Sequence, residues 1–120
     1  IGQDIGADYE PLKLQGGYDH NWVIDRKTES GIEQVATVWE PASGRTIEVL
    51  SDQPGLQVYS GNFFDGKSIG KYGKPQRYRE SLALETQKYP DSPNHDNFPS
   101  TVLRPGEEYT QVCIYRFGVK

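Results

Sequence analysis

Three segments of the sequence each carry a pair of polar side chains at alternate positions: Asp19 with Asn21, Gln57 with Tyr59, and Glu85 with Gln87. Residues i and i+2 of a β-strand point to the same face, so each pair would share one face of a sheet. Such a face suits a sugar, because hydroxyls need donors and acceptors and a pyranose ring stacks on aromatic side chains. The acids Asp19 and Glu85 would also suit a glycosidase, in which two carboxylates flank the scissile bond. The alternative is that these residues form the solvated faces of ordinary half-buried strands.

Strands are the elements that must position these residues. Alternation of apolar and polar residues predicts strands over 17–25, 32–41, 45–52, 55–61, 81–87 and 109–119. In the first strand, the bulky residues Tyr18, His20 and Trp22 would face away from Asp19 and Asn21.

The segments between these strands are predicted to be turns and loops. Pro41 and Gly44 in "EPASG" indicate a hairpin turn between the second and third strands. Residues 62–79 and 88–106 are long irregular loops. We expect no helix, because the candidate segment 6–14 is short and contains Pro11.

Composition and charge set limits on the kind of molecule. The chain has 120 residues, of which only 34% are hydrophobic, and its 13 Gly and 8 Pro are typical of a turn-rich β protein. The low apolar share and the absence of Met suggest part of a larger domain. A net charge of −4 argues against nucleic-acid binding, and no apolar stretch is long enough to predict a membrane span. The one cysteine allows no intrachain disulfide, and the compartment is left open between cytoplasm and periplasm.

A phosphate-loop pattern occurs in "GNFFDGKS", where Gly61, Gly66, Lys67 and Ser68 occupy the pattern positions. Phosphate binding by this motif needs a helix that starts at the Lys-Ser pair. The following "IGKYGKPQRY" contains three Gly or Pro residues that oppose a helix, so a Gly-rich surface loop is the better interpretation.

Two places in the sequence could support metal binding or histidine chemistry. Asp91, His95 and Asp96 lie in one polar loop, but no spacing matches a zinc or EF-hand signature. We expect His95 to be solvated. His20, which shares a face with Tyr18 and Trp22, is expected to be a hydrogen-bonded core or interface residue.

Several longer motifs resemble one enzyme family. "GGYDHNWVI", "VWEPASGRTIEVLSDQPGLQVYSGNFFDG" and "LALETQKYPDSPNHDNFPSTVLRPGEEY" are similar, in order and spacing, to the C-terminal part of the aldose 1-epimerase (galactose mutarotase) family. The resemblance runs from about residue 16 to residue 117. It implies an all-β fold, part of a galactose-mutarotase-like β-supersandwich of antiparallel strands with long loops, with residues 1–120 forming the C-terminal segment of a single domain.

The resemblance also assigns roles to three of the paired residues. Glu85, in "LETQ", would be the catalytic base, and Asp19 and Gln57 would bind sugar hydroxyls. The reaction would interconvert the α and β anomers of a hexose such as galactose or glucose by acid/base ring opening, without a metal or organic cofactor. Leu82 and Leu84 are expected to surround Glu85 and raise its pKa.

The family's general acid is a histidine in a more N-terminal segment, which has no counterpart here. We therefore expect the chain alone to be nearly inactive, with exposed strand edges that associate with the missing N-terminal segment or with another copy. Two alternatives stay open. One is a non-catalytic carbohydrate-binding or scaffold β-sandwich. The other is a hexose-6-phosphate 1-epimerase, for which a basic pocket would come from Lys67, Lys71, Lys74 and Arg77.

Overall fold

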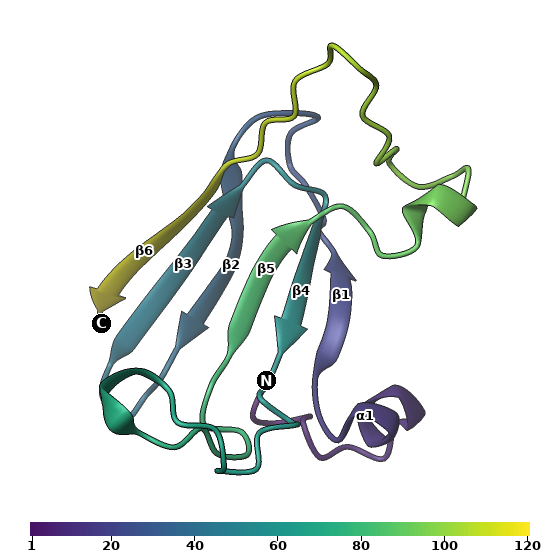
Figure 1. The fold of residues 1–120 in the computed structure, drawn as a ribbon. Coiled ribbons are helices and arrows are strands. Elements are labelled where there is room, and N and C mark those ends of the chain that lie inside the picture. The colour runs from purple at the N-terminus through teal and green to yellow at the C-terminus, as the bar shows by residue number, and fades with distance from the viewer. The chain divides into compact units, whose positions relative to one another are not determined.

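Strands dominate the computed structural model, which describes all of residues 1–120 (Figure 1). One sheet has the strand order β1 (Asp19–Val23), β4 (Gly55–Tyr59) and β5 (Ala83–Gln87), and the other has the order β2 (Glu33–Trp39), β3 (Arg45–Ser51) and β6 (Cys113–Val119). The helical elements are α1 (Glu10–Gln15) and the 3-10 turns η1 (Lys71–Gly73) and η2 (Ser92–Asn94). The expectation of an antiparallel all-β fold is confirmed. None of the helices is both long and apolar enough to cross a membrane.

The prediction that the N-terminal region has no helix is wrong for α1. Pro11 lies in the first turn of α1, where its missing N–H is not needed as a hydrogen-bond donor. Gly16 ends the helix in the left-handed conformation, with φ of 64°, and its N–H donates to the carbonyl of Lys13. The helix buries one residue, Leu12.

The predicted hairpin between β2 and β3 is present, and its turn is held by one side chain. The carboxylate of Glu40 accepts hydrogen bonds from the N–H of Ala42 (2.8 Å) and from the N–H (2.7 Å) and hydroxyl (2.5 Å) of Ser43. The Ser43 hydroxyl, followed by the two N–H groups, lowers the pKa of Glu40. Gly44, with φ of 72°, completes the reversal.

The last strand is shorter than predicted. β6 pairs with β3 from Arg45↔Val119 to Ser51↔Cys113, so residues 109–112 lie outside it. Two of those residues instead form hydrogen bonds with residues outside β6. The N–H of Val112 donates to the carboxylate of Asp52, and the Gln111 amide donates to the carbonyl of Thr86.

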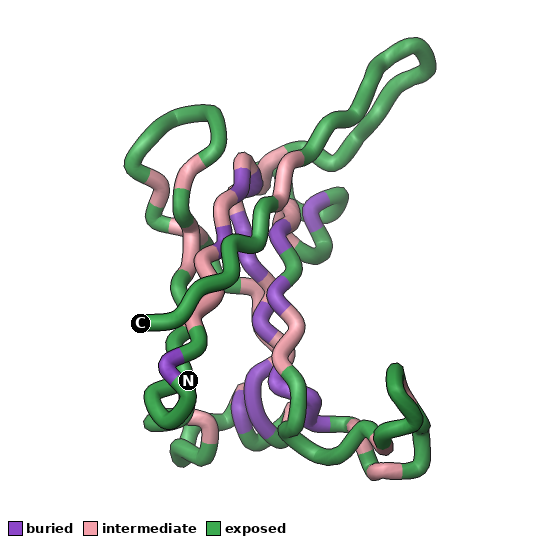
Figure 2. The backbone as a smooth tube through the Cα atoms, turned by 90° about the vertical axis from the view of Figure 1, so that its left-hand side faces the viewer, coloured by how far each residue is buried: buried purple, intermediate pink, exposed green.

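The chain forms two compact units, residues 1–22 with 57–85 and residues 23–56 with 86–120. In the first unit, Leu12, Tyr18, Val58 and Leu84 are buried. In the second, Val49 is fully buried and Leu56 nearly so. Four of these six buried apolar residues lie on strands, whereas the long loops are mostly exposed and are drawn mainly in green (Figure 2).

Candidate functional site

A buried polar cluster fixes the start of β1 against the end of β4. The N–H of Tyr18 donates to the hydroxyl of Ser60 (2.9 Å), and the N–H of Ser60 donates back to the carbonyl of Tyr18 (3.0 Å). The Asn62 amide donates to the same carbonyl (2.8 Å). Because these bonds satisfy buried polar groups, they set which residues of β1 lie beside β4.

Gly17 makes this close approach possible. A Cβ atom at position 17 would lie 2.3 Å from Oδ1 of Asn62 and 2.9 Å from Oγ of Ser60, and the φ of Gly17 is 149°. No other residue fits there without displacing the cluster. Gly17 of "GGYDHN" and Asn62 of "GNF" therefore lie in direct contact.

The same register brings Asp19 and Gln57 together. Nε2 of Gln57 donates a 2.8 Å hydrogen bond to Oδ1 of Asp19, and both residues are half-buried. The other amide atom, Oε1 of Gln57, is buried and has no hydrogen-bond partner. A buried acceptor without a partner is uncommon in folded proteins, so this oxygen is a hydrogen-bonding group that the fold leaves unused.

Glu85 lies on β5, the other neighbour of β4. Leu84 on β5 and Val58 on β4 are both buried, so alternation places Glu85 and Gln57 on the opposite face of the sheet. Glu85 is exposed. The expected apolar surroundings are wrong, because Glu85 is exposed, Leu84 points to the opposite face of β5, and Leu82 lies before the strand.

Asp19, Gln57 and Glu85 thus sit on three adjacent strands. Two strand spacings separate the outer strands laterally, about 10 Å in all. Carboxylate, amide and carboxylate groups at this spacing can surround a small polyhydroxylated ligand.

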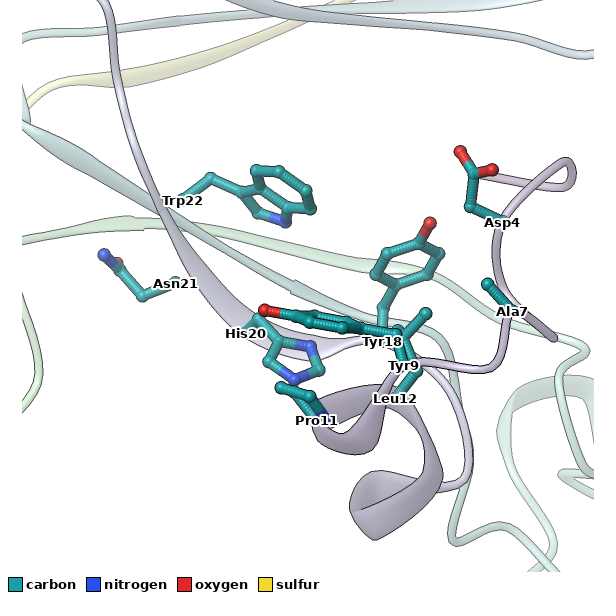
Figure 3. Close-up of a pocket in the computed structure, with 9 residues that line it drawn as sticks. All are labelled: Asp4, Ala7, Tyr9, Pro11, Leu12, Tyr18, His20, Asn21 and Trp22. Atoms are coloured by element: carbon teal, nitrogen blue, oxygen red, sulfur yellow. The ribbon is translucent and has the colours of Figure 1, made fainter.

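A cleft of about 440 Å³ opens on the other side of β1 (Figure 3). Its wall is mostly apolar and aromatic, with Tyr9, Leu12, Tyr18 and Trp22 among the lining residues. Tyr18 and Trp22 alternate with Asp19 along β1, so the cleft is distinct from the face that carries Asp19 and Gln57. The predicted bulky face of β1 agrees with this arrangement, because Tyr18, His20 and Trp22 all line the cleft. Asn21, which was expected on the polar face with Asp19, lines the cleft as well.

The two histidines differ in their surroundings. Nδ1 of His20 accepts a hydrogen bond from the N–H of Asp19 (3.1 Å), and the ring packs edge-on against Tyr18, as expected for a structural histidine. His95 is exposed, but it is not merely solvated. Its Nε2 lies 3.1 Å from Oδ2 of Asp91, and its ring packs on Phe98 with the centroids 4.6 Å apart.

No helix begins at the Lys67–Ser68 pair of the phosphate-loop pattern. Residues after Lys67 and Ser68 form a hairpin-like turn, and the first helical element is the three-residue η1. Lys67 is paired with Asp65 (2.8 Å). The interpretation as a surface loop is therefore correct. Nor do the His, Cys, Asp and Glu side chains gather anywhere in groups of three or more that could hold a metal ion.

Two residues that organise the second unit were missed in the sequence. Arg26 donates to the carbonyls of Gln53 (3.1 Å) and Gly31 (2.5 Å) and lies 3.1 Å from the carboxylate of Glu33. Asp52 accepts hydrogen bonds from Gln53 Nε2 (2.9 Å) and the N–H of Val112 (3.2 Å). Each network includes one partner that is distant in sequence, Gln53 for Arg26 and Val112 for Asp52, and no short motif indicates these contacts.

The sequence of the chain matches a known protein family. The family model described as aldose 1-epimerase matches residues 1–116. The chain belongs to the aldose 1-epimerase family. It is 45% identical over 116 residues to galactose mutarotase from Mus musculus, covering 97% of this chain and 33% of the relative. It is 37% identical over 119 residues to aldose 1-epimerase from Escherichia coli (strain K12), covering 98% of this chain and 34% of the relative.

The fold agrees with the sequence match. A crystal structure of a GalM/aldose epimerase homologue from C. elegans superposes with a TM-score of 0.74 at 31% identity, over 85% of this chain and 30% of that chain. The chain spans about a third of the length of the curated aldose 1-epimerase relatives that it matches.

Proposed function

We propose that this chain supplies the catalytic base and part of the sugar-binding face of an aldose 1-epimerase that interconverts the anomers of an aldohexose. The observation that carries the proposal is the Gln57–Asp19 hydrogen bond on the face to which Glu85 also points. Family membership supports it, because relatives named galactose mutarotase and aldose 1-epimerase match nearly the whole chain.

The binding role of Asp19 and Gln57 follows from the hydrogen bond between them. Oδ1 of Asp19 is engaged by Gln57, which leaves Oδ2 for a sugar hydroxyl donor. Gln57 holds that carboxylate in place, while its own Oε1 is buried and out of reach of a ligand. A carboxylate held by one hydrogen bond would fix a sugar hydroxyl in a set orientation.

The catalytic role of Glu85 follows from its exposure beside that face. Its carboxylate would remove the proton of the C1 hydroxyl while an acid protonates the ring oxygen, so that the C1–ring oxygen bond breaks and the free aldehyde forms. Rotation about C1–C2 and ring closure on the other face of the carbonyl give the other anomer. The proton returns from Glu85 to the new C1 hydroxyl, and the acid regains its own.

The acid is proposed to come from polypeptide outside this chain. His20 is engaged by the Asp19 N–H and lies on the opposite face of β1, and His95 pairs with Asp91. Exposed apolar side chains on β6, such as Phe117 (75% exposed) and Val119 (80% exposed), support a further protein surface that covers them. We expect size-exclusion chromatography with mass determination to show association, either with such a segment or between copies. A monomer that unfolds cooperatively would contradict this.

The test of the reaction is a chimera in which this chain replaces the matching third of mouse galactose mutarotase. Polarimetry of α-galactose should show anomer exchange, and Glu85→Gln should slow it by about 10² to 10⁴-fold, the usual contribution of a general base. Glu29→Gln is the matched control, because Glu29 is an exposed acid outside the three strands that carry the candidate residues. Retained turnover in Glu85→Gln would refute the assignment.

A second measurement separates catalysis from sugar binding alone. In an NMR titration of the isolated chain with galactose, the amides of Asp19 and Gln57 should shift saturably, and Glu85→Gln should preserve these shifts. A chimera that binds galactose but does not exchange its anomers, with Glu85 intact, would favour the non-catalytic carbohydrate-binding alternative.

A further inference from the structure

The long loop between β4 and β5, which runs from teal to green in Figure 1, is ordered by its own backbone bonds. Ile69 and Pro75 form an antiparallel bridge, and the N–H of Gly70 donates to the carbonyl of Lys74 (2.8 Å). The N–H of Gln76 donates to the carbonyl of Ser68 (2.8 Å). The loop is thus a hairpin, in which the turn from Lys71 to Lys74 holds two lysines close together.

The charge of this loop is opposite to that of the rest of the chain. Residues 60–82 contain five Lys or Arg residues and two Asp or Glu residues, a net charge of +3. Because the whole chain carries −4, the remaining residues carry −7. Such an asymmetry within one chain is typical of a segment that meets an anionic partner.

A hollow of about 250 Å³ lies along one side of the hairpin. We call it the 70–81 hollow, and the lining side chains that matter are Lys71, Lys74, Gln76, Arg77, Glu80 and Ser81. Glu80 is the one acid among the lining residues, and its contact with Arg77 is long (3.7 Å) and exposed, which makes it a weak ion pair.

The cations of the loop fall into two classes. Lys67 is paired with Asp65 (2.8 Å), and Arg79 packs over the ring of Tyr78 and donates to the carbonyl of Gly16 (2.8 Å). Lys71 and Lys74 line the hollow, and neither ammonium group takes part in an ion pair. The two unpaired lysines of the loop therefore both line the hollow, together with the weakly paired Arg77.

Neutral donors complete the lining. The side chain of Gln76 packs against Gly70, where a Cβ atom would lie 3.3 Å from Nε2 of Gln76. The absence of a side chain at Gly70 lets the amide lie close to the turn. Ser81 adds a hydroxyl at the end of the hollow that leads into β5.

We propose that the 70–81 hollow binds a phosphate group. Two ammonium groups and a guanidinium match the double negative charge of a phosphate, and the amide and hydroxyl can donate to its remaining oxygens. The site does not use the phosphate-loop pattern, because Lys67 of that pattern is paired with Asp65. It is independent of the proposed epimerase reaction, since a phosphate can bind here whether or not Glu85 is a base.

The test is an NMR titration of the 120-residue chain with inorganic phosphate at constant ionic strength, with chloride as the reference anion. Amides of residues 70–81 should shift saturably. The double variant K71Q/K74Q, and separately Arg77→Gln, should weaken binding by about tenfold or more, because each removes charge-assisted hydrogen bonds. Lys67→Gln, the matched control, should leave the affinity within about twofold.

Several outcomes would overturn the proposal. Linear shifts that do not saturate, equal weakening by Lys67→Gln, or an unchanged affinity in both K71Q/K74Q and Arg77→Gln would each show only diffuse attraction between the loop and anions. Equal shifts in residues 70–81 with unphosphorylated glucose would show that phosphate is not what is recognised.

The source of the phosphate is assigned by a second arm with glucose 6-phosphate. If glucose 6-phosphate binds more tightly than inorganic phosphate and Asp19→Ala removes the difference, the ligand is a phosphorylated sugar whose ring reaches the sheet. If the two bind equally, the hollow recognises the phosphate group alone. Both results support the site, whereas weaker binding of both than of chloride would contradict it.

Discussion

Gln57 donates a 2.8 Å hydrogen bond to Asp19 across 38 residues of sequence, and it leaves its own carbonyl oxygen buried without a partner. The bond orients an acid and an amide toward the same side of the sheet. It also ties the two residues energetically, because each keeps the other in one rotamer.

Asp19→Ala and Gln57→Ala should therefore weaken galactose binding by the chain by about tenfold each. The first removes a hydroxyl acceptor, and the second removes the hydrogen bond that orients it. The double variant should lose less than the product of the two effects, since either single change already releases its neighbour. NMR titrations with galactose of the wild type, the two single variants and the double variant give the four affinities of a double-mutant cycle. Strictly multiplicative losses would show that the two residues act independently.

Gly17→Ala should destabilise the chain by about 2–4 kcal/mol, because the new methyl group would collide with Asn62 and the φ of 149° strains any side chain. Urea unfolding followed by circular dichroism gives the free energy of unfolding. Gly6→Ala is the matched control, since nothing lies within 4 Å of a Cβ at that position. It should change stability by no more than about 0.5 kcal/mol. Equal effects of the two substitutions would contradict the close approach at Gly17.

Arg26→Met should lower the free energy of unfolding by about 3 kcal/mol, because the side chain of Glu33 (14% exposed) loses its cation and several carbonyls lose a donor. Lys27→Met is the comparison, since that side chain is exposed and the contact of Lys27 with Glu33 is made by its backbone N–H. A loss in Lys27→Met as large as that in Arg26→Met would mean that charge alone, rather than the Arg26 network, sets stability.

The stability that Asp52 contributes should depend on pH. Partial burial alone would raise the pKa of Asp52, but hydrogen bonds from Gln53 and the Val112 N–H outweigh it and hold the pKa below its usual value. A carboxyl whose pKa is lower in the folded state stabilises that state above its unfolded pKa, and the contribution is lost as the pH falls through the folded value. The difference in unfolding free energy between wild type and Asp52→Asn should be full above about pH 5 and shrink below about pH 4. A difference that is constant with pH would contradict this.

Sequence reasoning located the strands because alternation at a period of two is a local property. The turn around Gly44 was indicated by Pro41 and Gly44 themselves. The contact between Asp19 and Gln57 depends on which strands pair, and alternation within each strand does not reveal that. The surroundings of Glu85 were misjudged because Leu82 and Leu84 are close in sequence, although Leu84 points the other way and Leu82 lies before β5. Pro11 hides helix α1 in the sequence, because proline usually opposes a helix although a first turn tolerates it. The Tyr18–Ser60–Asn62 cluster and the Arg26 network depend on partners far along the chain, which no local pattern reveals.

The short turn that Glu40 stabilises should allow the β2–β3 hairpin to form early in folding. β2 and β3 are joined by residues 40–44, so their pairing costs little loop-closure entropy, whereas β1 meets β4 across more than 30 residues. We expect the β2–β3 hairpin to form before the folding transition state and the Asp19–Gln57 face to form after it. Stopped-flow refolding should then give a high φ-value for Val49→Ala in β3 and a low one for Val58→Ala in β4, and the reverse ranking would contradict this order. On this route, the face proposed to bind sugar is among the last parts of the chain to become native.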